Sequence, residues 1–296
     1  MNYLEKYGYS PNEEKIAAGI KELSGKIAEL SSPEVLKLAF SIMDLTTLSP
    51  TDTVESVSKL VDKVNGLPEA FPGYPAPASI CVYPNFAATV RSRRNNPEVH
   101  VTTVASCFPS AQSFLEVKVR ECELAVETGA DEIDIVLALN AFLNGEKERA
   151  FEEIVTMKKA IDKDAAAVKR EVVLKVILET GLLATPEKIA EASFLAMEAG
   201  ADFIKTSTGK VAVNATPEAA YVMCEAIRRF YEVTGRRVGF KAAGGISNAN
   251  DAVLYYGIAS RILGPEWMNK KLLRYGVSRL GNSLVSAIEG KEVKYF

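Results

Sequence analysis

"TPEKIAEASFLAMEAGADFIKTST", residues 185–208, holds the two kinds of segment whose alternation decides the fold. Its first part has a helical pattern and closes on Gly200, a glycine of the kind that ends a helix. Gly-Ala-Asp then leads directly into residues 202–208, a short strand-like run. The same order occurs upstream, where the helical stretch 111–129 ends on Gly129 and runs through Gly-Ala-Asp into another strand.

Short apolar segments rich in β-branched residues alternate with longer helical ones to the end of the chain. Eight strands alternating with helices over about 250 residues are typical of an α/β fold of the (β/α)8, or TIM, barrel type. A doubly wound open sheet is the alternative, but no Gly-x-Gly-x-x-Gly turn follows the first strand. The predicted strands are residues 40–48, 78–84, 100–108, 132–139, 172–178, 202–208, 238–243 and 272–277.

The chain ahead of the first strand has an amphipathic helical pattern, with apolar residues at Ile16, Ile20 and Leu23. No low-complexity linker divides the remainder of the sequence. We therefore predict an N-terminal helical extension (1–36), one barrel domain (37–290) and a short C-terminal tail (291–296).

Composition narrows the function classes. The 296 residues are 48% hydrophobic, which is enough for a large core in one domain or two. The 35 basic and 38 acidic residues are interspersed, which disfavours a nucleic-acid partner. The chain shows neither a signal-like start nor an apolar run near the roughly 18 residues that span a bilayer. We expect a soluble, cytoplasmic protein with no membrane partner.

Cysteine and histidine offer little to metal chemistry. The four cysteines are scattered without a Cys-x-x-Cys pair, as expected for reduced thiols. His100, the only histidine, stands at the start of a predicted strand, which favours a structural role. We expect no metal and no Ser-His-Asp triad.

Chemistry is indicated by polar residues inside the predicted strands. Parallel barrel strands are covered on both faces and should be almost wholly apolar. A single buried lysine is usually a salt-bridge partner or reaches solvent along its stem. Several on consecutive strands converge on the barrel axis, toward the strand ends where such barrels build their sites. The exceptions here are Asp44, Cys81, Asp134, Lys175, Lys205 and Lys241.

Convergence would couple the titration of these lysines. Burial and a neighbouring ammonium group both disfavour the charged form of a lysine. A pKa lowered to about 7 would raise the fraction of neutral amine at neutral pH from roughly one part in a thousand to about half. A neutral amine attacks carbonyls, as in Schiff-base enzymes, while Asp134 could retain the second ammonium group and relay protons.

Three glycine-containing loops, residues 207–210, 242–252 and 274–283, predict an anion site. "AAGGISNANDA" (242–252) frees the backbone at Gly244 and Gly245 before a helix start. Loops after strands seven and eight are the recurrent phosphate site of TIM barrels. Lys210 alone could equally be a solvated loop charge. Together the loops favour a phosphorylated substrate, with Gly209, Lys210, Gly244, Gly245, Gly276, Ser278 and Arg279 as candidate residues.

Six stretches of the chain resemble a known family. The stretches "MDLTTL", "ICVYP", "DEIDIV", "LKVILETG", "GADFIKTSTGKVAVNATPE" and "GFKAAGGI" are similar to the deoxyribose-phosphate aldolases, class I aldolases of (β/α)8 fold. The similarity runs from about residue 38 to about residue 286. It implies reversible cleavage of 2-deoxy-D-ribose 5-phosphate to acetaldehyde and D-glyceraldehyde 3-phosphate without cofactor or metal. It makes a homodimer plausible.

The resemblance also implies roles for individual residues. Lys205 would form the Schiff base, Lys241 would lower its pKa, and Asp134 would organise proton transfer. Lys175 would join this network, and Cys81 would line the pocket as an exposed thiol. Asp44 and Thr46 would lie near the sugar hydroxyls. Phosphate would be held by Gly209, Lys210, Gly244, Gly245, Gly276 and Ser278.

Three features depart from the family pattern. Arg279 stands where a second small hydroxyl residue is usual, and Ala242 where proline is common. Tyr295 is penultimate, whereas some members end in a tyrosine that reaches the site. Two other interpretations stay open: a Schiff-base aldolase with a different donor, and a phosphosugar-binding barrel without catalytic activity.

Overall fold

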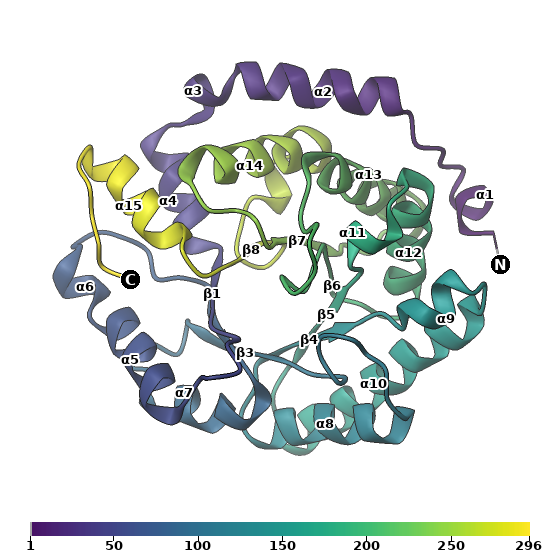
Figure 1. Cartoon of the computed structure of the whole chain (residues 1–296), viewed down its shortest axis with the longest axis horizontal. Helices are drawn as coiled ribbons and strands as arrows, with labels where there is room; N and C mark the ends of the chain where they lie inside the picture. The colour runs from purple at the N-terminus through teal and green to yellow at the C-terminus, as the bar shows by residue number, and fades with distance from the viewer. Residues whose placement is uncertain (1) are drawn as a thin grey trace.

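Eight parallel strands close into a barrel in the order in which they occur in the chain, as the computed structural model shows for residues 2–296 (Figure 1). The predicted (β/α)8 fold is therefore confirmed. Each strand falls inside a predicted one and is shorter at one end or at both. The strands are β1 (Met43–Thr46), β2 (Ser79–Val82), β3 (His100–Val104), β4 (Glu132–Val136), β5 (Val173–Ile177), β6 (Phe203–Lys205), β7 (Gly239–Ala243) and β8 (Leu273–Val277).

A ring of helices surrounds the barrel (Figure 1). Several begin at a side-chain cap: the hydroxyl of Thr216 accepts from the amide of Ala219, and Pro217 takes the first helical position. Between the strands lie α5 (Val54–Asn65), α6 (Leu67–Ala70), α7 (Ala87–Arg93), α8 (Leu115–Glu127), α9 (Leu139–Leu143), α10 (Lys147–Ala167), α11 (Thr180–Leu183), α12 (Pro186–Glu198), α13 (Pro217–Thr234) and α14 (Ala249–Leu263), and the 3-10 turns η1 (Pro84–Phe86) and η2 (Pro265–Trp267). Helix α15 (Leu280–Glu289) follows the last strand.

The sequence before β1 forms α1 (Tyr3–Tyr7), α2 (Glu13–Gly25), α3 (Ile27–Leu30) and α4 (Pro33–Ser41). The first three lie outside the ring, along α12, α13 and α14 (Figure 1). Tyr7 anchors α1, since its ring stacks on Phe194 with centroids 4.3 Å apart and its carbonyl accepts from Arg229 Nε at 2.5 Å. The division into extension, barrel and tail stays a prediction, and its boundary after residue 36 falls within α4.

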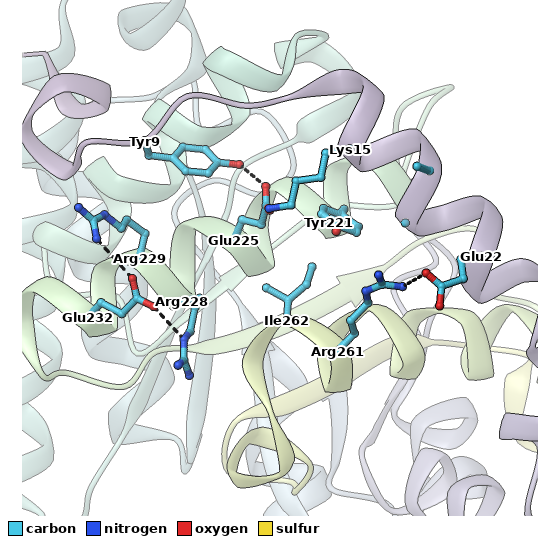
Figure 2. A pocket seen from close by; sticks show the side chains of 12 residues that line it. Tyr9, Lys15, Glu22, Tyr221, Glu225, Arg228, Arg229, Glu232, Arg261 and Ile262 are labelled. Atoms are coloured by element: carbon cyan, nitrogen blue, oxygen red, sulfur yellow. Dashed lines mark hydrogen bonds and ion pairs between the residues drawn. The ribbon is translucent and has the colours of Figure 1, made fainter.

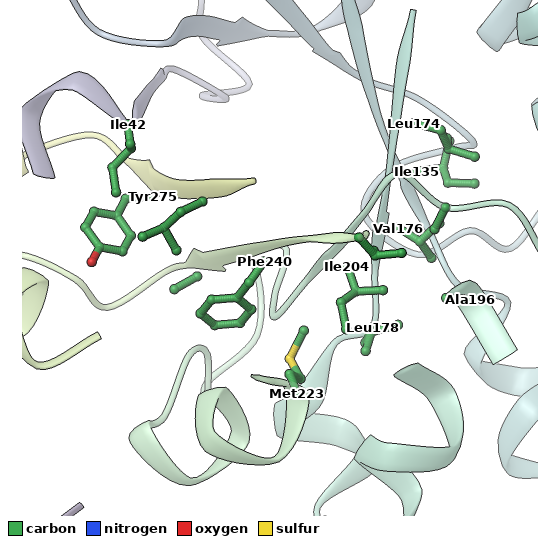
Figure 3. Close-up of a cluster of buried hydrophobic side chains, with 14 of the residues drawn as sticks. Ile42, Ile135, Leu174, Val176, Leu178, Ala196, Ile204, Met223, Phe240 and Tyr275 are labelled. Carbon is green, nitrogen blue, oxygen red and sulfur yellow. The ribbon is translucent and has the colours of Figure 1, made fainter. Parts of the chain in front are cut away.

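The main core lies between the outer face of the strands and the helices. Ile204 of β6, Phe240 of β7 and Met223 of α13 are buried together there (Figure 3). Since side chains alternate along a strand, the neighbours of Ile204 face the barrel interior instead. Phe203, for example, lies under the Arg274 guanidinium, 5.8 Å from ring centroid to Cζ.

None of the helices in residues 2–296 is both long enough and apolar enough to cross a bilayer.

Replacing Tyr7 by alanine should loosen the extension. The change removes a stacked, buried ring, so we expect the free energy of unfolding to fall by about 3 kcal/mol in urea denaturation. Val233→Ala is the control, because that side chain is 52% exposed and its loss should change stability by less than about 0.5 kcal/mol. Equal stability of Tyr7→Ala and the parent would show that α1 is not anchored by this stack.

Candidate active site

Charged side chains fill the interior of the barrel. Strand register brings them together: Asp134 of β4 is opposite Lys175 of β5, and Lys205 of β6 is opposite Lys241 of β7. All are buried. The interior carboxylates are Asp44, Glu132 and Asp134, and the cations are Lys175, Lys205, Lys241 and Arg274.

Asp134 links the two lysines expected to carry the chemistry. Its Oδ2 accepts a hydrogen bond from Lys205 Nζ at 2.8 Å and from Lys241 Nζ at 2.8 Å. Its other oxygen, Oδ1, accepts from Lys175 Nζ at 2.9 Å. Lys241 also donates to Asp44. The predicted convergence of Asp134, Lys175, Lys205 and Lys241 is therefore present in the fold.

Sequence reasoning missed two members of this network, Glu132 and Arg274. The Arg274 guanidinium grips both oxygens of Glu132, at 2.9 and 2.6 Å, and reaches Asp44 Oδ1 at 2.6 Å. Lys175 Nζ lies 2.6 Å from the same Glu132 carboxylate. Strand periodicity could have indicated Glu132, because it stands two positions before Asp134 on one strand and therefore lies on the same face.

The network holds one more cation than it has carboxylates. Asp44, Glu132 and Asp134 can neutralise three positive charges. Arg274 and Lys241 each contact two of these carboxylates, and Lys175 contacts all three. Lys205 contacts only Asp134, through an oxygen that it shares with Lys241. It is therefore the cation that can lose its proton with the least loss of ion pairing.

The pKa values follow from these contacts. Burial, with a smaller contribution from the Lys241 charge, holds the pKa of Lys205 below its ordinary value, although Asp134 opposes the shift. For Lys241, burial acts to lower the pKa, but Asp134 and Asp44 outweigh it and raise the pKa above the usual range. Burial also acts to raise the pKa of Asp134, but the surrounding lysines hold it well below the ordinary value.

A cavity of about 570 Å³ opens at the carboxyl ends of the strands, and Lys205 lines it. The six residues predicted to hold phosphate all line this cavity as well. Close packing requires glycine at position 276, where an added Cβ would lie 2.8 Å from the Ala243 Cβ and 3.1 Å from Lys241 Cε. The predicted lining residues are Thr46, Lys205, Gly209, Lys210, Gly244, Gly245, Gly276, Ser278 and Arg279.

Two cationic side chains reach the rim from different loops. Lys210 Nζ donates to the carbonyl of Leu48 at 2.6 Å, so it bridges the loops after β6 and β1. Arg279 is exposed and forms no ion pair within the described part of the chain. Thr208 and Asn214 also line the cavity, although no pattern in the sequence indicates that they belong to the site.

The structure contradicts the predicted exposure of Cys81, whereas a place for Asp44 near the sugar hydroxyls stays a prediction. Cys81 is not an exposed pocket thiol: it is fully buried with Leu48 and Val104, and burial raises its pKa. Asp44 is fully buried and does not line the cavity, because its carboxylate is engaged by Lys241 and Arg274. Strand pattern predicts the face of a side chain but not its depth below the cavity.

Tyr295, the penultimate residue, lies away from the barrel cavity in this structure. Its hydroxyl donates to the carbonyl of Lys63 at 2.7 Å, and its ring packs edge-on against Phe71, 5.2 Å between centroids. The side chain does not line the cavity.

A second cavity of about 560 Å³ lies between the extension and helices α13 and α14 (Figure 2). Its charges pair with one another, as in Lys15 with Glu225 at 2.6 Å and Arg261 with Glu22 at 2.7 Å. Residues 2–296 contain no group of three His, Cys, Asp or Glu side chains that could hold a metal ion. The barrel cavity is thus the stronger candidate for catalysis.

Comparisons with known proteins agree with this geometry. Residues 38–254, more than half of the chain, match the family described as "DeoC/LacD family aldolase". A Caenorhabditis elegans protein, provisionally named deoxyribose-phosphate aldolase, is 39% identical over 272 residues, which are 91% of this chain and 86% of that protein.

Solved structures give the same result. The deoxyribose phosphate aldolase of Aeropyrum pernix, described as tetrameric, superposes with a TM-score of 0.67 at 26% identity, covering 91% of this chain and 97% of that one. A Coccidioides immitis protein, provisionally named deoxyribose-phosphate aldolase, gives a TM-score of 0.69 at 26% identity, covering 95% of this chain and 98% of that one. With its closed barrel, its buried lysines and this similarity over most of its length, the chain belongs to the DeoC/LacD family of aldolases.

Proposed function

We propose that this chain is a deoxyribose-phosphate aldolase, which cleaves 2-deoxy-D-ribose 5-phosphate reversibly to acetaldehyde and D-glyceraldehyde 3-phosphate. One observation carries the proposal: Lys205, a buried lysine with a lowered pKa, lines the same cavity as the glycine loops and Lys210. The nucleophile and the anion site are thus within reach of one small sugar phosphate. Relatives that carry this activity in their names support the choice of substrate.

Lys205 is the proposed nucleophile. Its neutral amine adds to the C1 aldehyde of the open-chain sugar, and loss of water gives an iminium ion. Deprotonation of the C3 hydroxyl then lets the C2–C3 bond break, and its electron pair moves into the iminium to form an enamine as D-glyceraldehyde 3-phosphate leaves. Protonation of the enamine carbon and hydrolysis of the new iminium release acetaldehyde and restore the amine.

Asp134 and Lys241 are proposed to serve the proton transfers. The Asp134 carboxylate, 2.8 Å from both lysine nitrogens, can relay a proton between Lys205 and the reacting groups, directly or through water. Lys241 keeps a positive charge beside Lys205 and thereby favours the neutral amine there. Phosphate would be held by Lys210, Gly209 and the loops after β7 and β8.

Small aldehydes and a phosphorylated sugar are the proposed partners of the site. A homodimer and a cytoplasmic location complete the proposal. Sedimentation of the purified protein would decide the oligomeric state.

Borohydride trapping tests the proposed mechanism. With acetaldehyde present, reduction should add one ethyl group to the protein, and peptide mass analysis should place it on Lys205, because a neutral amine forms an imine that hydride fixes. The parallel assay is formation of D-glyceraldehyde 3-phosphate from 2-deoxy-D-ribose 5-phosphate.

Lys205→Met is the matched control and should show neither adduct nor cleavage. No adduct on the parent chain would overturn the Schiff-base mechanism. An adduct without cleavage of the deoxyribose phosphate would instead indicate an aldolase with a different substrate.

Lys241→Leu should shift the pH profile of kcat/KM upward. The reaction needs neutral Lys205, which is present above its pKa. Losing the Lys241 charge raises that pKa, so the rising limb of the profile moves to higher pH. At neutral pH we expect kcat/KM to fall on the order of 10²-fold or more.

The control for this variant is Lys118→Met. Lys118 is another buried lysine, paired with Glu153 at 2.7 Å, but it lies on α8 outside the barrel interior. It should lose stability without any shift of the pH profile. An unmoved profile in Lys241→Leu would show that Lys241 does not set the protonation of Lys205.

Arg279→Ser should weaken binding of the phosphorylated substrate. An exposed guanidinium at the rim adds a modest, screened attraction, so we expect KM to rise about threefold to fivefold at low salt with kcat unchanged. The rise should shrink as salt is added. Arg228→Ser, at the second cavity, is the control, and an equal KM in both variants would mean that Arg279 points away from the phosphate.

A further inference from the structure

Glu179 is a buried acidic residue at the end of β5 that the proposed mechanism does not use. Its backbone has φ 54° and ψ 59°, in the left-handed region that residues with a Cβ rarely adopt. Its side chain is 2% exposed. Such a conformation persists only where surrounding contacts enforce it, and it concentrates at functional sites.

The Glu179 carboxylate is held by a residue of the neighbouring loop. Thr208, which follows β6, donates its amide to Oε1 at 3.2 Å and its hydroxyl to Oε2 at 2.5 Å. Glu179 forms no ion pair with a lysine or arginine anywhere in residues 2–296, so these two donors are its principal compensation. A buried carboxylate strongly favours keeping such charge-assisted bonds.

Thr208 connects the Glu179 carboxylate to the backbone of Lys210 through its hydroxyl group. Because the hydrogen of its hydroxyl is directed at Glu179, the oxygen is left to accept, and it accepts from the Lys210 amide at 3.0 Å. The direction of both hydrogen bonds is thus set by the carboxylate. The turn between them contains Gly209 with φ 79°, and all three residues of the turn line the cavity, whereas Glu179 does not.

We propose that Glu179 is a positioning residue for the substrate phosphate, acting through Thr208 to fix the turn that presents Gly209 and Lys210. The inference rests on the proposed function and adds a residue to its anion site. The anion that Glu179 serves is a phosphate monoester, and Glu179 does not touch it.

The test separates phosphate binding from the chemistry at Lys205. Thr208→Val keeps the shape and removes the hydroxyl, and Thr208→Ser restores it. Glu179→Gln turns one acceptor into a donor, so only one of the two Thr208 donors, the amide or the hydroxyl, keeps an acceptor. Each variant is assayed with 2-deoxy-D-ribose 5-phosphate and with unphosphorylated 2-deoxy-D-ribose, and its affinity for inorganic phosphate is measured by calorimetry.

We expect Thr208→Val and Glu179→Gln to raise KM for the phosphorylated sugar about tenfold and to weaken inorganic phosphate binding similarly, the loss of one charge-assisted hydrogen bond. Activity on unphosphorylated deoxyribose and the yield of the borohydride adduct should fall much less than activity on the phosphorylated sugar, because neither depends on a phosphate group. Thr208→Ser should behave like the parent, and the double variant should be no worse than either single one, because both act through one chain of bonds.

Equal losses on both sugars, a fall in kcat alone, or unchanged phosphate affinity in Thr208→Val would overturn the inference. Should Glu179→Gln fail to fold, the comparison of Thr208→Val with Thr208→Ser still decides it. Failure of the proposed function looks different: the parent itself would give no adduct and no cleavage, while phosphate binding would still report on the turn.

Discussion

The excess of one cation over the carboxylates inside the closed barrel is the constraint on which the site depends. These side chains are buried away from bulk solvent, so each charge must be compensated by another side chain. Asp44, Glu132 and Asp134 compensate three of the four cations, and the fourth, Lys205, shares an oxygen with Lys241. A closed barrel imposes this arrangement for two reasons. Neighbouring strands fix the spacing of the side chains, and there is no edge strand past which an interior side chain could reach solvent.

The site is divided between two levels of the barrel. Below, the charged network sets protonation states and, apart from Lys205, does not line the cavity. Above, loops after β6, β7, β8 and β1 surround the cavity and can recognise an anion without disturbing the network. Lys205 belongs to the network and also lines the cavity, so it connects the two levels. This division explains why Asp44 and Cys81, although on the correct face of their strands, are buried under the site and not exposed in it.

Sequence alone could predict the barrel and the converging lysines, because strand periodicity assigns a face to each residue and burial makes a charge on that face conspicuous. The same rule should have found Glu132 and Arg274. Both stand near the start of their strands, Glu132 on β4 and Arg274 on β8, where a charge is ordinarily solvated. The depth of a side chain along the barrel axis depends on the register between strands, which the sequence of a single strand does not contain. The prediction for Cys81 was wrong for this reason. Glu179 was beyond reach, since its role depends on a backbone angle and on a bond to a loop 29 positions away.

Stability alone does not account for the charged network, because a buried ion cluster is often no more stabilising than apolar residues of the same volume. The lowered pKa of Lys205 carries a cost in folding stability. Its pKa is lower in the folded chain than in the unfolded one, so between those two values the unfolded state binds the extra proton and stability rises with pH. At neutral pH the fold is therefore less stable than it would be if the pKa of Lys205 were the same in the folded and unfolded states. In the proposed reaction the iminium ion returns a positive charge to that nitrogen, 2.8 Å from Asp134 in the free protein. A purely apolar pocket would favour the neutral amine but oppose the cation that follows, whereas a shared carboxylate can accommodate both.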